Sequence, residues 1–292
     1  MKLVTYRRAD GSEQVGAVLA DQGLEERVLA LESVAPHGML ALLATGPAGM
    51  ARVAAFVQAC TPATLAACPP LREVDLRAPV PRPGKIVGVG RNYADHAKET
   101  GVAPFEKPRI IFKASSSVVG PRAPVPRPPL VTKLDFEAEL AVVIGRSAKQ
   151  ISADTALDYV AGYTVLDDVS AREFQFDVAP PQTTFAKSMD GFCPMGPWLV
   201  TADEIVDPQT LEVRCWVNEV LMQSGQTADM LFPVATLIAY LSQFMTLEPG
   251  DVIATGTPAG SGAFRTPPQW LQPGDRVRMA VSQVGVLEHV IV

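Results

Sequence analysis

The sequence predicts a β-rich α+β fold, and three observations support that prediction. Short apolar runs recur along the chain and are separated by turn residues, which is typical of strands rather than long helices. Proline accounts for 26 of the 292 residues, about 9% against a usual 5%, and this favours short strands joined by rigid turns. Beyond the N-terminal part, only two segments show a clear helical pattern. With 48% apolar and 19% charged residues, the chain can bury a core.

A proline cluster between Thr61 and Pro83 divides the chain, because such a density disfavours helix and central strand alike. The predicted parts are a small N-terminal α/β accessory domain at 1–70, a proline-rich linker at 71–83 and a main domain at 84–292. The elements expected in the first part are strands at 1–6 and 15–19 and a helical stretch at 39–59, broken at Gly46-Pro47.

The main domain is expected to consist mostly of short strands. They are the apolar or alternating runs at 86–90, 109–112, 134–144, 163–166, 211–217, 252–255, 277–281 and 286–292. One helix is predicted at 153–160, where Ser152 precedes it and Gly162 follows. The other is predicted at 233–245, where apolar side chains recur on one face.

Charge and composition exclude several classes of protein. The formal net charge of −6 argues against nucleic acid or an anionic membrane surface as a partner. No run of about 18 apolar residues is present to span a bilayer, and residues 1–8 lack the apolar core of a signal peptide. We therefore expect a cytoplasmic protein that acts on a small molecule. The 4 cysteines form no C-x-x-C pair and only 3 histidines are present, so a zinc site is not expected.

Acidic residues alternate at the start of the predicted strand 134–144. With a period of two, Asp135, Glu137 and Glu139 fall on one face. Like charges at this spacing repel, and acidic residues are poor strand formers. One interpretation is a solvated edge strand. The other is that a cation holds the carboxylates together, and their oxygens suit Mg²⁺ or Mn²⁺ rather than zinc.

A second acidic pair follows the apolar run 163–166. Because Asp167 and Asp168 are adjacent at the end of a strand, their side chains point to opposite faces, and only one of them can join the glutamates. The alternative is a helix N-cap, in which Asp168 or Ser170 caps a turn that begins at Ala171.

A histidine and a glutamate are spaced for contact in the segment after the strand at 86–90. His96 and Glu99 are three residues apart and share one face of a helical turn. A carboxylate bonded to one imidazole nitrogen raises the basicity of the other, which makes a general base for water. The alternative is a surface ion pair. The glycines before His96 do not fit the dinucleotide-binding pattern.

Taken in order, the motifs of residues 84–292 resemble those of the fumarylacetoacetate hydrolase family. They are E-x-E at 137–139, D-D-V-S-A-R-x-x-Q at 167–175, F-A-K-S-M-D-G-F-C-P-M-G-P-W at 185–198 and T-G-T-P-A-G at 255–260. The resemblance implies a mixed β-sandwich roll, usually assembled as a homodimer, of the acylpyruvate hydrolase-like bacterial type with a short N-terminal domain. It also implies one Mg²⁺ or Mn²⁺ held by Glu137, Glu139 and Asp168.

The same resemblance implies roles for residues around the metal. His96 and Glu99 match the catalytic dyad, and Gln175 and Lys187 match groups that face the substrate or an oxyanion. The residues matched to substrate binding are Arg91, Lys113, Arg172, Gly256 and Thr257. The departures from the family pattern are Asp167 where Asn is common, Glu173 for Asp, Ala186 for Gly and Ala114 for Pro.

The expected reaction is hydrolysis of a C–C bond in an acylpyruvate such as fumarylpyruvate, which yields pyruvate and a carboxylic acid. A 2-oxo acid can chelate the metal, His96 can deprotonate a water that attacks the distal 4-oxo carbon, and Gln175 or Lys187 can stabilise the oxyanion. Two alternatives use the same metal: decarboxylation of oxaloacetate or a related 2-oxo acid, and isomerisation of a 2-oxo-enoic acid. An inactive fold used for binding is an alternative of another class.

Overall fold

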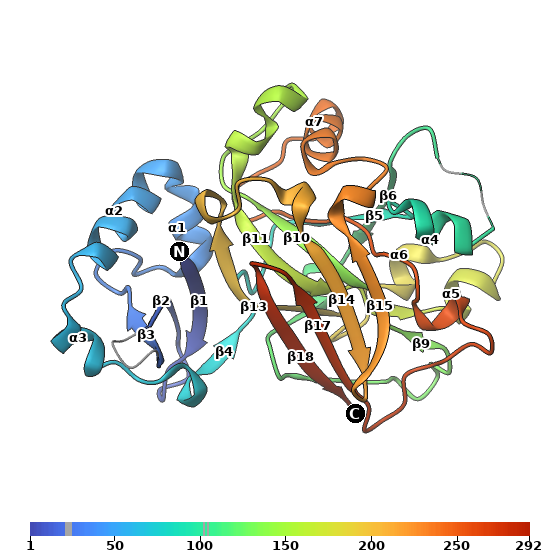
Figure 1. Cartoon of the computed structure of the whole chain (residues 1–292), viewed down its shortest axis with the longest axis horizontal. Helices are drawn as coiled ribbons and strands as arrows, with labels where there is room; N and C mark the ends of the chain where they lie inside the picture. The colour runs from blue at the N-terminus through green and yellow to red at the C-terminus, as the bar shows by residue number, and fades with distance from the viewer. Residues whose placement is uncertain (21–24, 102, 104) are drawn as a thin grey trace.

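The computed structural model describes residues 1–20, 25–101, 103 and 105–292, and it confirms a strand-rich α+β fold (Figure 1). The larger sheet is mixed, open and 11-stranded. Along its path the strands are β3 (Glu26–Ala30), β2 (Glu13–Ala20), β1 (Lys2–Arg7), β13 (Cys193–Thr201), β11 (Val160–Asp167), β10 (Ala138–Ile144), β16 (Val252–Ala254), β5 (Ile86–Gly90) and β6 (Arg109–Lys113). Off this path, β4 (Asp75–Arg77) pairs with β1 and β7 (Val118–Val119) pairs with β13.

A second, 5-stranded sheet packs on the first. Its strands are, in order, β15 (Val220–Gln226), β14 (Glu212–Val217), β17 (Arg276–Val281), β18 (Gly285–Ile291) and β8 (Pro124–Val125). A separate pair is formed by β9 (Leu134–Asp135) and β12 (Ser170–Ala171). Leu140 and Val142 of β10 share one buried core with Val213 of β14 and Met279 of β17. Burial of these side chains holds the two sheets face to face.

Helices flank the sheets. The α-helices are α1 (Gly38–Ala44), α2 (Gly46–Gln58), α3 (Pro62–Ala66), α4 (Ala94–Glu99), α5 (Glu173–Phe176), α6 (Thr183–Ala186) and α7 (Val234–Phe244). The 3₁₀ turns are η1 (Leu71–Glu73), η2 (Ser115–Ser117), η3 (Ala153–Tyr159), η4 (Ala202–Glu204), η5 (Pro208–Thr210), η6 (Thr227–Asp229) and η7 (Gly262–Phe264).

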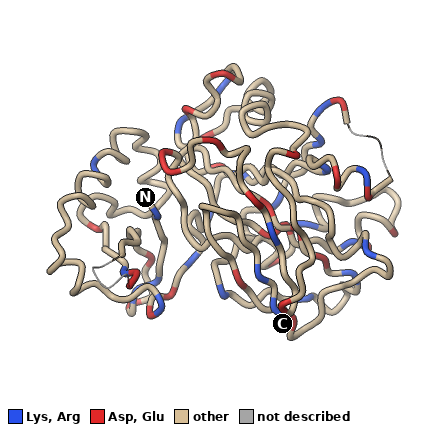
Figure 2. Tube along the Cα trace, in the orientation of Figure 1, with Lys and Arg blue, Asp and Glu red and all other residues tan. Residues whose placement is uncertain are grey.

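Within the described ranges no single helix is long and apolar enough to cross a bilayer. Helices α1 and α2 meet that length and apolarity only as a pair bent by 117°. Figure 2 shows Lys and Arg interspersed with Asp and Glu over the trace.

The N-terminal part joins the rest through the sheet, because β1 pairs with β13. Strands β1 and β2 lie where strands were predicted, whereas β3 was not predicted. Thr45 separates the two helices of the stretch 39–59. The segment Thr61–Pro83 is more structured than expected. Helix α3 accepts Pro62 in its first turn, where the missing N–H costs little, and Thr61 caps it. Strand β4 lies at an edge, and the three-part domain division stays a prediction.

Two elements have a different secondary structure from the one predicted. The helix predicted at 153–160 is the 3₁₀ segment η3, which leads directly into β11 at Val160. The strand predicted at 134–144 is interrupted between β9 and β10. At the interruption, the backbone N–H of Phe136 donates to Asp135 Oδ1 at 2.9 Å, and that of Glu137 donates to Asp167 Oδ1 at 3.0 Å. Side-chain carboxylates therefore replace the ladder hydrogen bonds there.

Candidate active site

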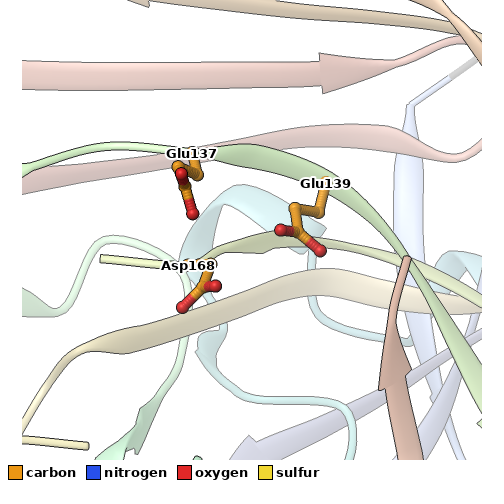
Figure 3. A group of neighbouring side chains, drawn as sticks. All are labelled: Glu137, Glu139 and Asp168. Carbon is orange, nitrogen blue, oxygen red and sulfur yellow. The ribbon is translucent and has the colours of Figure 1, made fainter. Parts of the chain in front are cut away.

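Three carboxylates converge where β10 begins and β11 ends (Figure 3). Glu137 directly precedes β10, Glu139 lies within it, and Asp168 directly follows β11. The backbone N–H of Asp168 donates to the carbonyl oxygen of Glu137 at 2.9 Å, which holds the two segments together. One oxygen from each of the three side chains lies within 4.8 Å of the others. The structure therefore brings together the three residues predicted to hold a metal.

The alternative interpretations of these acidic residues are wrong. Strand β10 is paired on both sides, and Glu137 and Glu139 are only 5% and 3% exposed, so the segment is not a solvated edge strand. No helix begins at Ala171, because this residue belongs to β12 and α5 begins two residues later. Asp167 points away from the triad, as expected for adjacent residues, and accepts a hydrogen bond from His289 Nε2 at 2.8 Å.

Two buried lysines bond to members of the acidic triad, namely Glu137 and Asp168. Lys187 Nζ donates to Glu137 Oε2 at 2.7 Å, to Asp168 Oδ2 at 2.6 Å and to Ser170 Oγ at 2.8 Å. These contacts use all of its N–H bonds. Lys113 Nζ donates to Asp168 Oδ1 at 2.6 Å from behind, and its side chain is fully buried. Lys113 therefore orients Asp168 instead of facing the substrate space as expected.

Arg172 bonds three side chains at once. Its Nε donates to Asp135 Oδ2 at 2.8 Å, its Nη2 to Glu137 Oε1 at 2.6 Å and its Nη1 to Gln175 Oε1 at 2.9 Å. Because a guanidinium only donates, the last contact fixes the Gln175 amide with its NH₂ group free to donate. Asp135 also accepts from the backbone N–H of Gly262 at 2.7 Å. The expected common face for Asp135 and the two glutamates is therefore wrong, because the interruption at 136–137 turns Asp135 toward Arg172.

The predicted dyad is formed on helix α4. His96 Nδ1 lies 2.6 Å from Glu99 Oε1, and His96 is 4% exposed, so the pair is not a surface ion pair. The Glu99 carboxylate also accepts from the backbone N–H of Gly260 at 3.1 Å. The ring of Phe264 packs edge-on against the imidazole at 5.4 Å between centroids. Among the described residues, His96 Nε2 has no hydrogen-bond partner, and this nitrogen is left for the substrate.

A cavity of about 240 Å³ connects the dyad and the triad. The predicted residues that line it are Arg91, His96, Glu137, Glu139, Asp168, Arg172, Gln175, Lys187, Gly256 and Thr257. Arg109 and Phe264 also line the cavity, although neither was among the predicted site residues. Neither of them stands in a motif, and no local pattern distinguishes them from structural residues.

The turn after β16 closes one side of the cavity. Gly256 has a φ of +99°, and a Cβ there would lie 2.8 Å from the Cβ of Asn92, so only glycine fits. Its backbone N–H donates to Glu139 Oε2 at 2.7 Å. Thr257 Oγ1 donates to the carbonyl of Ala138 at 2.8 Å, which commits its proton and leaves the hydroxyl only an acceptor.

The charges of the triad are unevenly compensated. Burial would raise the pKa of Glu137, but Arg172 and Lys187 outweigh burial and hold this pKa well below its ordinary value. Burial raises the pKa of Glu139 well above its ordinary value, and the carboxylates of Asp168 and Glu137 raise it further. Burial would lower the pKa of Lys187, but the same two carboxylates raise it. Of the three acids, Glu139 is thus the one whose ionised form would be stabilised most by an additional cation.

The three acids fit a divalent cation. They offer only carboxylate oxygens, which are hard ligands that suit Mg²⁺ or Mn²⁺, and the group contains no His or Cys ligand that would favour zinc. Glu139 lies between two other acids with a single backbone N–H as its hydrogen-bond donor among the described residues. A cation bound by all three would remove that imbalance.

The strand-rich fold, the acidic triad and the His–Glu dyad around one cavity are typical of an enzyme that acts on a small molecule by acid–base chemistry. Residues 85–292 match the family described as fumarylacetoacetate (FAA) hydrolase C-terminal. The triad, the dyad and the quoted motifs all lie within this span. The chain therefore belongs to the fumarylacetoacetate hydrolase family.

Relatives of the chain carry several activities. It is 48% identical over 223 residues to the human mitochondrial oxaloacetate tautomerase FAHD2A, covering 76% of this chain and 71% of the relative. The fumarylacetoacetate hydrolase of Exiguobacterium antarcticum has a TM-score of 0.82 at 37% identity, covering 100% and 99% of the two chains. The maleylpyruvate hydrolase of Sphingobium sp. SYK-6, solved with manganese(II) and pyruvate, has a TM-score of 0.78 at 30% identity, covering 100% and 99%.

Proposed function

We propose that this protein is a Mg²⁺- or Mn²⁺-dependent tautomerase that interconverts the keto and enol forms of oxaloacetate. The observation that carries the proposal is a buried imidazole with one free nitrogen on the wall of the cavity that the acidic triad also lines. Keto–enol exchange needs one proton carrier beside a bound 2-oxo acid, and it needs no attacking water. The 48% identity to an oxaloacetate tautomerase supports the choice of substrate.

His96, Glu99 and Gln175 have different roles in the proposed reaction. His96 Nε2 takes the proton from C3 of the keto form and returns it to the oxygen on C2, so that C3–H and C=O become C=C and O–H. The reverse reaction moves the proton back along the same path. Glu99 holds His96 Nδ1 and stabilises the imidazolium, as the acid of a hydrolytic triad does. The free NH₂ of Gln175 can donate to a substrate oxygen. When bound, the divalent cation supplies a Lewis acid for the negative charge on the 2-oxo group.

Lys187 has a narrower role here than the sequence suggested. Its N–H bonds are all used by Glu137, Asp168 and Ser170, so none remains for a substrate oxyanion in this arrangement. Of the two candidates for that role, Gln175 is the one with free donors. We therefore assign oxygen stabilisation to Gln175 and alignment of the triad to Lys187.

The test is the loss of ultraviolet absorbance as enol-oxaloacetate converts to its keto form, measured with and without Mn²⁺. We expect His96→Gln to lower kcat by about 10²- to 10⁴-fold, the usual contribution of a positioned acid–base group. His37→Gln is the matched control, because His37 is exposed at the start of α1. An unchanged rate in His96→Gln, or a rate that does not depend on the metal, would contradict the proposal.

Hydrolysis of an acylpyruvate is the second candidate. It is favoured by the structural neighbour that was solved with manganese(II) and pyruvate and by the dyad, which can deprotonate a water. The discriminating measurement is pyruvate release from acetylpyruvate and fumarylpyruvate, with oxaloacetate tested in parallel for loss of CO₂. Rapid pyruvate release that collapses in His96→Gln would establish the hydrolase. Loss of CO₂ that survives this substitution would indicate a decarboxylase.

A further inference from the structure

Two arginines of the cavity wall are placed together by the β5–β6 pair. Gly90 at the end of β5 is the register partner of Arg109 at the start of β6, and Arg91 follows Gly90 directly. Both arginines are half-buried, and both line the cavity that contains the acidic triad. Arg91 has a φ of +57°, a backbone conformation that residues other than glycine rarely adopt. The fold therefore holds this side chain at a defined and unfavourable backbone position.

These two arginines differ from the other cations of the site in having no acid beside them. Lys187 pairs with Glu137 and Asp168, and Arg172 pairs with Asp135 and Glu137. Among the described residues, neither Arg91 nor Arg109 forms an ion pair. Arg91 stands over the ring of Phe105, with 5.6 Å from its Cζ to the centroid, and Arg109 Nη2 lies 3.5 Å from Thr183 Oγ1.

Partial burial of two unpaired guanidinium groups is costly unless an anion joins them. The pKa of Arg91 is lowered, first by burial and then by the nearby positive charge of Arg109. A carboxylate between them would relieve both effects, and guanidinium groups are well suited to bind it through paired hydrogen bonds.

We propose that Arg91 and Arg109 form a second carboxylate subsite, so that this protein selects a short 2-oxo diacid over a 2-oxo monoacid. The inference rests on the proposed function for the placement of the first carboxylate and the 2-oxo group near the triad. Arg109 is the newly assigned member, since only Arg91 was among the residues matched to substrate binding. The cavity of about 240 Å³ favours a short carbon chain between the two carboxylates.

The experiment compares two four-carbon ligands, oxaloacetate and 2-oxobutanoate, which differ by the distal carboxylate. Binding is measured by calorimetry on Mn²⁺-loaded protein in a His96→Gln background, which suppresses turnover. We expect the diacid to bind about 10- to 100-fold more tightly, as charged hydrogen bonds imply. Adding Arg109→Gln should remove most of this preference and leave the affinity for 2-oxobutanoate within about twofold.

Three further variants make the result specific. Arg109→Lys keeps the charge but not the paired hydrogen bonds, so it should restore part of the preference. Arg91→Gln should reduce the preference independently. Arg52→Gln, on the exposed side of α2, is the matched control and should change nothing. The subsite is refuted if the parent shows no preference for the diacid, or if Arg109→Gln and Arg91→Gln both leave the preference intact.

The two proposals can fail separately. A diacid preference that is lost in Arg109→Gln establishes the subsite even where the wild-type protein shows no tautomerase activity, and the proposed function then falls alone. Tautomerase activity in a protein that binds both ligands equally keeps the proposed function and overturns the subsite.

Discussion

Replacement of Asp135 by asparagine tests whether the network around Arg172 holds the site together. Asp135 is fully buried, and its carboxylate accepts from Arg172 Nε at 2.8 Å and from the backbone N–H groups of Phe136, Gly262 and Ala263 at 2.9, 2.7 and 3.1 Å. An amide would turn an NH₂ group toward at least one of these donors and would remove the charge that faces Arg172. Breaking a buried ion pair in this way costs about 3–5 kcal/mol. Because Arg172 keeps Glu137 as a partner, we expect a loss near 3 kcal/mol.

The assay is equilibrium urea unfolding of Asp135→Asn without metal. Asp177→Asn is the matched control, because Asp177 makes the same kind of contact with Lys133 at 2.7 Å but is 47% exposed. We expect the control to lose less than about 1 kcal/mol, as exposed ion pairs do. Equal losses in the two variants, or a loss below about 1 kcal/mol in Asp135→Asn, would refute the reasoning.

Two other predictions follow from pKa shifts. Without metal, the folded protein keeps a proton on Glu139 to a higher pH than the unfolded chain does, so its unfolding free energy should fall as pH rises above about 4.3, by at most about 1.4 kcal/mol per pH unit. Burial also raises the pKa of Asp135 and of Asp167, so Glu139→Gln should reduce this slope in urea unfolding with chelator rather than abolish it. A slope that persists unchanged would contradict the assignment. Burial raises the pKa of the Cys193 thiol to about 12, so iodoacetamide at pH 8 should spare Cys193 and modify the partly exposed Cys60. Mass spectrometry of the native protein checks this, and rapid modification of Cys193 would be the contrary result.

Strands with a strong local sequence pattern could be predicted from the sequence. Strand β13 shows why strands that depend on their neighbours in the sheet could not. The strand β5 lies at the predicted residues 86–90, because an apolar run bounded by glycine signals a strand by itself. Strand β13 contains Pro194 and Pro197, which usually exclude a central strand. It nevertheless lies between β1 and β11, and its pairing with β11 shifts register between Tyr163 and Val165. The accommodation of proline depends on the partner strands, which the local sequence does not identify.

The residues of the site also differ in whether the local sequence predicts their positions. The opposite orientation of Asp167 and Asp168 follows from strand geometry alone, and the structure confirms it. The spacing of His96 and Glu99 likewise predicts their contact. In contrast, Arg109 reaches the cavity through sheet pairing with β5 and stands in no motif. Its contribution depends on long-range geometry, which a single sequence read locally cannot supply.

The interruption between β9 and β10 explains how so many acids coexist in one buried place. In a continuous strand, Asp135, Glu137 and Glu139 would share one face. The break turns Asp135 toward Arg172, whose Nε donates to Asp135 and whose Nη2 donates to Glu137. Glu137 then gives one oxygen to Arg172 and the other to Lys187. Asp135 therefore pairs with Arg172 and takes no part in the triad, whereas Glu137 both pairs with Arg172 and belongs to the triad.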